Sequence, residues 1–176
     1  YNLLENLLYW SRSQRGNLVN NPEQTNLYDL IVENIELLKT MARNKDIEIV
    51  NNVDEDVTAF ADRNMIKTVI RNLIINAIKF TDAKGSITIS SEERDDHVKI
   101  SIVDTGIGIK KSTLEKILNN RDYYTTFGTN REKGSGLGLN LCLDFIERNG
   151  GELYIDSEYG KGSTFSFILP ISSTAE

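Results

Sequence analysis

One helical stretch constrains the fold of this chain more than any other part of the sequence. Apolar residues recur at helical spacing from Ile66 to Ile78, which predicts a helix that buries one face. Three polar residues, Asn72, Asn76 and Lys79, interrupt this pattern. At about 100° per residue they share about 60° of arc, and so lie on one face. That face is either a solvated surface or one wall of a polar site, and the helix alone leaves both interpretations open.

The bulk composition is that of an ordinary soluble protein. The 176 residues include 39% hydrophobic and 26% charged side chains, enough for one domain with a full core. The net charge of -6 argues against nucleic acid as the main partner. No apolar run reaches about 18 residues, so we expect no direct insertion into a membrane. Because Tyr1 is not a natural start, we expect a piece of a longer protein.

The chain has one cysteine and one histidine. Cys142 falls on an apolar helical face and has no intrachain disulfide partner, which fits a reducing, cytoplasmic setting. We expect a buried, unreactive thiol. His97 is expected at the start of a strand, as a structural residue at the surface. One Cys and one His cannot supply a zinc site.

Helices and hairpins alternate in an order that predicts an α+β domain, a two-layer α/β sandwich with a mixed, mostly antiparallel sheet. Thr25 and Asp62 are the expected N-caps of the second and third helices. We expect helices at 2–15, 25–42, 62–80, 112–118 and from 136, strands at 47–53 and 58–61, and hairpins at 87–102 and 153–169.

Two glycine clusters flank a long stretch with little predicted structure, which in a compact domain is usually functional. The first, Asp104–Ile109, ends a strand, and its glycines would let a ligand approach the backbone. Its aspartate could accept a hydrogen bond from an amino group such as that of adenine. The second, Gly134–Leu139, opens a helix, where backbone N–H groups and the dipole suit phosphate. Either cluster alone can also be an ordinary loop.

The usual nucleotide motifs do not fit. The second cluster is Gly-x-Gly-x-Gly without a strand directly before it, which weakens a dinucleotide-binding interpretation. The chain contains no P-loop and no protein-kinase His-Arg-Asp loop.

The order of these parts resembles the ATP-binding superfamily of sensor histidine kinases, gyrase, heat-shock chaperones and mismatch-repair ATPases. The likeness extends over about residues 25–170 and is greatest to the catalytic domain of a bacterial sensor histidine kinase. Asn72–Thr81 looks like its N box, Asp104–Gly108 its G1 box, Gly134–Leu139 its G2 box and Gly160–Ser163 its last glycine motif.

The resemblance implies a Bergerat-type ATP-binding fold with the helices on one face of the sheet. Residues 1–16 would be a remnant of the dimerisation and phosphoacceptor domain, 17–24 a linker, 25–171 the catalytic domain and 172–176 a tail. The phosphoaccepting histidine would lie on a helix that this sequence lacks.

The resemblance also assigns roles to residues. Asn76 would coordinate Mg²⁺ with support from Asn72, and Lys79 would contact the phosphates of ATP. Asp104 would bind the adenine amine, assisted by Ser163 or Thr164. Arg131 and Lys133 could reach the γ-phosphate or be merely solvated. The other expected nucleotide contacts are Phe80, Gly106, Gly108, Ile109, Gly134, Gly136, Leu137, Gly138 and Leu139, and the expected apolar wall is Ile78, Ile107, Ile109 and Leu137.

Two features qualify this assignment. The family's phenylalanine-bearing lid motif is not cleanly present, and which of Tyr123, Tyr124 and Phe127 replaces it stays open. Hydrolysing members of the superfamily carry a glutamate where this chain has Asn72. An amide cannot act as a general base, so Asn72 favours a phosphoryl donor over an ATPase.

The expected function is therefore transfer of the γ-phosphoryl group of Mg-ATP to a histidine on the dimerisation helix of the same protein. The expected partners are that helix, in a homodimer, and a response-regulator receiver domain. The expected location is cytoplasmic, compatible with a full-length protein anchored in the inner membrane. The alternatives are a stand-alone ATPase or ATP-gated interaction module, a serine kinase acting on a regulatory protein, and a non-catalytic binding module.

Overall fold

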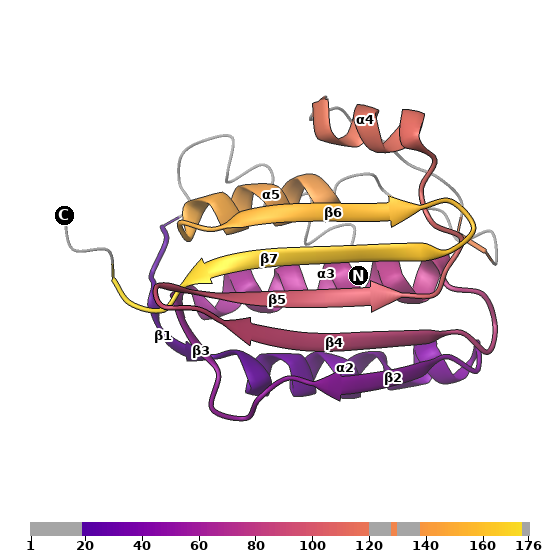
Figure 1. Cartoon of the computed structure of the whole chain (residues 1–176). Helices are drawn as coiled ribbons and strands as arrows, with labels where there is room; N and C mark the ends of the chain where they lie inside the picture. Colours follow the sequence, from indigo (N-terminus) through magenta and orange to yellow (C-terminus); the bar gives the residue numbers. More distant parts are fainter. Residues whose placement is uncertain (1–18, 120–127, 130–137, 174–176) are drawn as a thin grey trace.

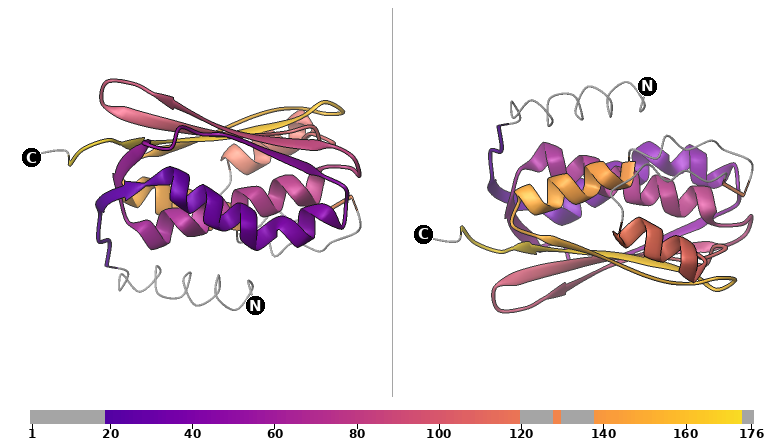
Figure 2. Two further views of the ribbon diagram at one scale, coloured as in Figure 1. Left: turned by 90° about the horizontal axis from the view of Figure 1, so that it is seen from below. Right: turned by 90° about the horizontal axis from the view of Figure 1, so that it is seen from above.

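One sheet and a layer of helices make up most of the chain. The computed structural model describes residues 19–119, 128–129 and 138–173. Five strands form the sheet in the order β2-β4-β5-β7-β6, with β2 and β4 parallel and the other neighbours antiparallel. Helices α2, α3 and α5 lie together on one face (Figures 1 and 2). The predicted two-layer sandwich and mostly antiparallel sheet are confirmed.

A separate pair of short antiparallel strands, β1 and β3, precedes the main helix α3. Helix α4 lies near the β6 edge of the sheet (Figure 1). None of the helices in the described residues is long and apolar enough to cross a bilayer. The described elements are β1 (Glu23–Asn26), α2 (Leu27–Arg43), β2 (Glu48–Asn52), β3 (Thr58–Ala61), α3 (Arg63–Phe80), β4 (Ser86–Glu93), β5 (His97–Asp104), α4 (Lys111–Asn119), α5 (Gly138–Arg148), β6 (Glu152–Glu158) and β7 (Gly162–Pro170).

The core lies between the sheet and the helices. The predicted apolar stripe of α3, from Ile66 to Ile78, is buried. Alternation along the strands turns Ile87, Ile100 and Phe167 of β4, β5 and β7 inward, and each is fully buried. Burying one such side chain contributes about 2 kcal/mol. Helix α3 is therefore held along its whole length, which fixes the direction of its other faces.

Helix α3 begins and ends where the sequence predicts. Asp62 is its N-cap, and the carboxylate accepts hydrogen bonds from the backbone N–H groups of Asn64 and Met65, both at 3.0 Å. After Phe80 the chain becomes extended at Thr81, which ends the helix.

The start of the second helix differs from the prediction. Asn26, not Thr25, is the N-cap, and its side chain accepts a hydrogen bond from the first turn of α2. Thr25 lies in β1, where its hydroxyl donates to the carbonyl of Ala61 at 3.1 Å. The long-range pairing of β1 with β3 decides this boundary. Strand β1 consequently begins at Glu23, inside the predicted linker 17–24.

Cys142 and His97 have the structural roles expected of them. Cys142 is fully buried, and burial raises the pKa of its thiol to about 12, so the thiol stays protonated. His97 begins β5, and its Nδ1 lies 2.6 Å from Oδ1 of the exposed Asp96. The predicted helix within 1–16 lies outside the described residues.

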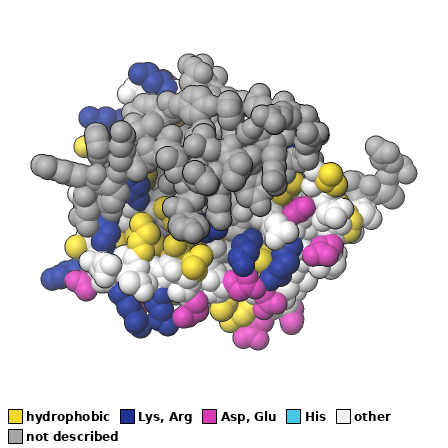
Figure 3. Space-filling model, turned by 180° about the vertical axis from the view of Figure 1, so that it is seen from behind, with side chains coloured by type: hydrophobic (Ala, Val, Ile, Leu, Met, Phe, Trp, Pro, Cys, Tyr) yellow, Lys and Arg dark blue, Asp and Glu magenta, His cyan; other side chains and the backbone are white. Residues whose placement is uncertain are grey.

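The outer surface of the helical layer carries charges of both signs (Figure 3). Glu33 of α2 accepts from Arg63 and Lys67 of α3, both at 2.6 Å. The hydrogen bond from Lys67 is the main cause of a lowered pKa at Glu33. Lys67 and Asn76 are nine residues apart, about two and a half turns, so they lie on opposite sides of α3. The solvated face of α3 is thus not the face that carries the asparagines.

Asn149 links the start of α3 to the end of α5, close to the N-terminal segment. Its Oδ1 accepts from the backbone N–H of Asp62 at 2.6 Å, and its Nδ2 donates to the carbonyl of Phe145 at 2.7 Å. The carboxylate of Asp62 also accepts from the N–H of Asn21 at 3.1 Å. Asn149 is buried, so its own two bonds are made away from solvent. This amide joins the start of α3 and the end of α5.

Replacing Asn149 with alanine should destabilise the fold. Asn149→Ala leaves the buried N–H of Asp62 without its acceptor, so we expect the free energy of unfolding to fall by about 2 kcal/mol, measured by urea denaturation followed by circular dichroism. The control is Asn52→Ala at the exposed end of β2, which should change this free energy by less than about 0.5 kcal/mol. Equal effects of the two variants would contradict the role given to Asn149.

Candidate functional site

The polar face of α3 is largely buried, not solvated. Asn72 and Lys79 are each 7% exposed, and Asn76 between them is partly buried. Lys79 Nζ lies 4.6 Å from the centroid of the Phe80 ring, on which the ammonium stacks. Burying the amide of Asn72 and the ammonium of Lys79 costs free energy unless these groups have polar partners, so such groups are uncommon on a solvated face. The structure therefore favours the wall of a polar site over the solvated surface.

Asn72 faces the start of α5. A Cβ placed on Gly138, the first residue of α5, would lie 3.6 Å from Asn72 Oδ1. Asn72 Nδ2 is buried without a hydrogen-bond partner by geometry. The amide lies close to the Cys142 thiol, and it opposes the rise in the pKa of that thiol that burial causes. A buried unpaired donor in a native protein calls for a functional explanation. The amide group of Asn72 lies beside the first residue of α5, and an anion is favoured at a helix N-terminus.

The first glycine cluster rests on the carboxyl end of α3. The N–H of Ile107 donates to the carbonyl of Phe80 at 3.0 Å. A Cβ on Gly106 would collide with that same Phe80 carbonyl oxygen, and one on Gly108 would collide with the carbonyl of Glu158. Gly108 also has φ = 64°, in the left-handed region. Glycine is thus required at both positions for the loop to lie against α3 and the β6–β7 hairpin.

Asp104 is a buried carboxylate at the end of β5. It is 4% exposed, and its Oδ1 accepts from the N–H of Gly106 at 2.8 Å. Burial raises the pKa of this carboxyl above its usual range, while hydrogen bonds from the backbone N–H groups of Gly106 and Ser163 oppose the rise. The carboxylate keeps further acceptor capacity for a ligand that donates a hydrogen bond. Ser163, its register partner on β7, is 8% exposed.

Thr164 points away from Asp104. Successive residues of a strand face opposite sides of the sheet, so Ser163 and Thr164 cannot both face the helices. Thr164 pairs across the sheet with Val103 and Asp156, which are exposed. Of the two hydroxyls predicted to assist Asp104, the structure brings Ser163 to it and places Thr164 on the opposite face.

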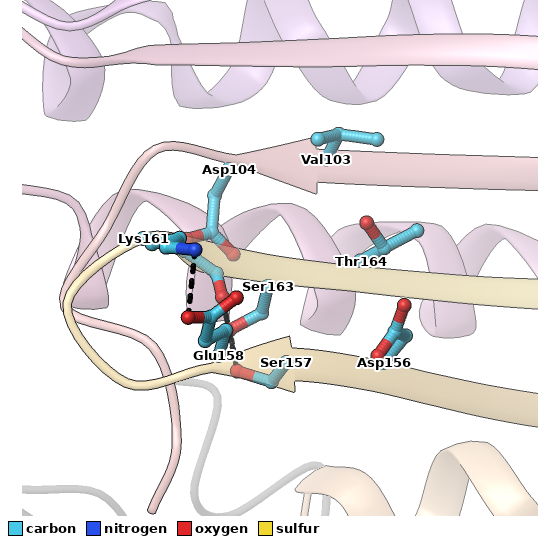
Figure 4. Close-up of a pocket in the computed structure, with 9 residues that line it drawn as sticks. Val103, Asp104, Asp156, Ser157, Glu158, Lys161, Ser163 and Thr164 are labelled. Carbon is cyan, nitrogen blue, oxygen red and sulfur yellow. Dashed lines mark hydrogen bonds and ion pairs between the residues drawn. The ribbon is translucent and has the colours of Figure 1, made fainter.

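A pocket of about 210 Å³ opens on that opposite face, at the tip of the β6–β7 hairpin (Figure 4). An ion pair of 2.7 Å between Lys161 Nζ and Glu158 Oε1 lies in it. Its lining includes Asp104, Ser157 and Ser163 but none of the polar residues of α3. The pocket therefore shares Asp104 and Ser163 with the residues predicted to bind the base, while the polar residues of α3 lie on the helical side of the sheet.

Ser157 is a site residue that the sequence analysis missed. Its Oγ accepts from the N–H of Ile109 at 2.8 Å and lies 2.9 Å from Oγ of Ser163. It also donates to the carbonyl of Gly162 at 3.0 Å, so it fixes the end of the glycine loop to the hairpin. The signal was present, because Ser157 follows Leu153 and Ile155 on the inward side of β6.

The remaining predicted contacts divide into three groups. Leu139 and Ile109 pack against the core from its edge, and Ile107 is 36% exposed, so it remains available to a ligand. Ile78 is fully buried in the core, which gives it a structural role. The predicted contacts outside the described residues are Arg131, Lys133, Gly134, Gly136 and Leu137, together with the aromatic candidates Tyr123, Tyr124 and Phe127.

The donor set of α3 fits a magnesium ion held together with phosphate. Within the described ranges, no three His, Cys, Asp or Glu side chains cluster as a metal site. Asn76 offers a partly exposed amide oxygen, and Asn72 lies one turn away on the same face. Mg²⁺ takes oxygen ligands, keeps several waters and is commonly bound through one or two protein groups plus substrate phosphates. A sparse set of amide oxygens is consistent with this mode.

Known proteins match both the sequence and the fold. The model of the histidine kinase-, DNA gyrase B- and HSP90-like ATPase family matches residues 61–173. Adaptive-response sensory kinase SasA of Synechocystis is 34% identical over 171 residues, which are 96% of this chain and 44% of SasA. The chain thus spans less than half the length of this curated relative.

Solved histidine kinase structures have the same fold. The catalytic domain of histidine kinase ThkA is 31% identical with a TM-score of 0.72, covering 85% of this chain and 95% of that domain. The structure of ThkA in complex with response regulator protein TrrA is 29% identical with a TM-score of 0.73. The match covers 97% of this chain and 49% of that chain. Full-length ShkA in complex with AMPPNP is 26% identical with a TM-score of 0.80. The match covers 99% of this chain and 36% of ShkA.

The extent of the family match and the near-complete coverage of a solved catalytic domain identify this chain. It belongs to the family of histidine kinase-, DNA gyrase B- and HSP90-like ATPases, in its histidine kinase branch.

Proposed function

We propose that this chain holds Mg-ATP between α3, the Asp104 loop and the start of α5, and presents the γ-phosphoryl group to a histidine on a helix of the same protein. The observation that carries the proposal is the convergence of three parts distant in sequence. The buried amide of Asn72 faces Gly138 at the start of α5, and the carbonyl of Phe80 holds the loop that follows Asp104. AMPPNP bound to the related ShkA supports a nucleotide as the ligand.

The α3 side of the site would bind metal and phosphate. Asn76 would hold Mg²⁺ through its amide oxygen, with Asn72 as a supporting ligand. When bound, the ion would supply positive charge that offsets the negative charge of the phosphates. Lys79 would contact the phosphates as a point charge. The backbone N–H groups in the first turn of α5, at Gly138 and Leu139, would add donors for the same anion.

The Asp104 side would bind the base. A buried carboxylate with two backbone donors already in place can accept one more hydrogen bond, and the exocyclic amine of adenine supplies it. Ser163 would support this contact from β7, and Ile107, with part of its side chain exposed, would cover the base from the loop. Because guanine has a carbonyl oxygen at the corresponding position, a carboxylate there would also select against it.

Asn72 provides no general base, and this determines what we expect to happen to bound ATP. An amide cannot accept the proton of an attacking water, so bound ATP should persist until an external nucleophile arrives. The His97 ring is held by Asp96 at the start of β5, at the surface, and is not proposed as the acceptor. The acceptor would be a histidine on a dimerisation helix. A response-regulator receiver would take the phosphoryl group next, as the complex of ThkA with TrrA suggests for a relative. We also propose a cytoplasmic location.

Substituting Asn76 tests metal binding and transfer together. Asn76→Ala removes the proposed metal ligand, so Mg²⁺ should no longer raise the affinity for AMP-PNP, a gain that calorimetry should place at about tenfold or more in the wild type. A longer chain that includes the acceptor helix should incorporate acid-labile phosphate, and Asn76→Ala in that chain should not.

The matched control is Asn64→Ala, an exposed asparagine near the start of the same helix, which should leave affinity and phosphorylation unchanged. Steady phosphate release without any protein phosphorylation would instead favour an ATPase module. Phosphoserine formed on a second protein would favour the serine kinase. Nucleotide binding that never depends on Mg²⁺ would favour a non-catalytic module.

Substituting Asp104 tests base recognition. Asp104→Asn should lower the affinity for ATP about tenfold and reduce the preference for ATP over GTP, measured by calorimetry with both nucleotides. The pKa of Asp104 is raised, so wild-type affinity should be present above that pKa and lost as the pH falls through it, while the asparagine variant shows no such step. The exposed Asp156→Asn on the outer face of the sheet is the control.

The substitution Asp104→Asn should not lower protein stability, although it lowers the affinity for ATP. A carboxyl whose folded-state pKa exceeds its unfolded value makes the fold less stable at neutral pH, and that cost disappears as the pH falls and the group protonates. Asp104→Asn should therefore be at least as stable as the wild type at pH 7 in a thermal melt. A large loss of stability together with the loss of affinity would contradict a recognition role for this carboxylate.

A further inference from the structure

A lysine outside every motif described above is buried against the nucleotide site. Lys45 lies in the turn between α2 and β2 and is 6% exposed. Its Nζ donates to the backbone carbonyls of Ile78 and Lys79 at 2.8 and 3.1 Å, and to Thr129 Oγ1 at 2.6 Å. An ammonium is costly to bury, and it persists where several oxygens replace its water. Three such bonds indicate a fixed position.

The carbonyls that Lys45 binds belong to the last turn of α3. A helix leaves its final carbonyls unpaired, and the dipole makes this end negative, so a cation is favoured there. The turn that carries Lys45 is itself attached to the segment after α3, because the Lys45 carbonyl accepts from the N–H of Lys84 at 3.2 Å. The ammonium and the turn therefore hold the end of α3 from two sides.

Thr129 adds a third segment to this junction. Its N–H donates to the Lys79 carbonyl at 3.1 Å, and its hydroxyl lies 3.2 Å from the carbonyl of Thr81. Gly128 beside it is buried. Thr129 is the point at which the described part of the chain between α4 and α5 meets α3. Lys45 Nζ and the Thr129 N–H share the Lys79 carbonyl as acceptor, so these contacts form one connected network.

The same turn of α3 carries two elements of the proposed site. The side chain of Lys79 stacks on Phe80 and is the proposed phosphate contact, and the carbonyl of Phe80 holds the glycine loop through Ile107. A small shift of this turn would move the ammonium of Lys79 relative to the phosphates. Productive sites keep such groups within about 0.5 Å of their working positions, so a network that holds this turn has direct consequences for binding.

We propose that Lys45 is a positioning residue for the phosphate side of the nucleotide site, acting by tying the carboxyl end of α3 to Thr129. The proposal rests on the proposed function, because it assumes that Lys79 contacts phosphate. It extends that function to a residue that touches no nucleotide. The base side of the site is held by other hydrogen bonds, from the N–H of Gly106 to Asp104 and between the hydroxyls of Ser157 and Ser163.

The test compares ligands with and without phosphates. Lys45→Met keeps the length of the side chain and removes the ammonium, so the affinity for Mg²⁺-AMP-PNP should fall about tenfold while the affinity for adenosine stays unchanged. A purely structural lysine would affect both ligands alike. The control is Lys39→Met on α2, where the lysine is 43% exposed and pairs with Glu36, and both affinities should stay at wild-type values.

A second variant keeps the test informative if Lys45→Met fails to fold. Thr129→Val preserves shape and the backbone bond to Lys79, removes only the hydroxyl, and should weaken Mg²⁺-AMP-PNP binding about threefold without affecting adenosine. Where both variants fold, the double variant should bind no worse than Lys45→Met, since the two act through one network. Circular dichroism and thermal melts establish folding for each.

Two results separate the inference from the function on which it rests. Unchanged Mg²⁺-AMP-PNP affinity in Lys45→Met and Thr129→Val, with Asn76→Ala still losing its metal dependence, would overturn the role of Lys45 and leave the proposed function intact. Equal losses for adenosine and AMP-PNP would also overturn it. A wild-type chain that binds no Mg²⁺-AMP-PNP would overturn the proposed function, and with it this inference.

Discussion

A helix that ends inside a protein must find partners for its last carbonyl oxygens, and the end of α3 meets this requirement with parts of the site itself. The Phe80 carbonyl accepts from Ile107, whose loop carries the glycines after Asp104. The carbonyls of Ile78 and Lys79 accept from Lys45, and that of Lys79 also from Thr129. The backbone bonds that end α3 are thus the bonds that bring together the walls of the proposed nucleotide site.

The other end of α3 makes this arrangement rigid. Asp62 caps the helix, and its carboxylate also accepts a hydrogen bond from the N–H of Asn21. The side chain of Asn149, at the end of α5, accepts a hydrogen bond from the N–H of Asp62. Between its ends, a buried apolar stripe fixes the rotation of the helix about its axis, and therefore the direction of Asn72 and Asn76. A site carried by packed elements holds its groups in place without reorganising when ligand binds. Helix α3 carries no Asp or Glu, so it offers no carboxylate that could act as a general base.

The sequence predicted those features that depend on local spacing. Apolar periodicity and the Asp62 cap located α3, and alternation located both hairpins, because each signal lies within one element. Features set by long-range pairing were missed or left open. Thr25 became a strand residue through its pairing with β3, and only the register of β7 could decide between Ser163 and Thr164. Lys45 looks like an ordinary turn lysine in sequence, and its partners are more than 30 residues away.

We propose that the polar face of α3 and the carboxylate of Asp104 are the two ends of one nucleotide site. A crystal structure of this chain with Mg²⁺ and AMP-PNP tests it most directly. We expect the amide oxygen of Asn76 in the coordination sphere of the ion, the adenine amine within hydrogen-bonding distance of Asp104, and the phosphates beside Lys79 and the start of α5. A nucleotide bound instead in the pocket on the outer face of the sheet, between Val103 and Asp156, would contradict the claim.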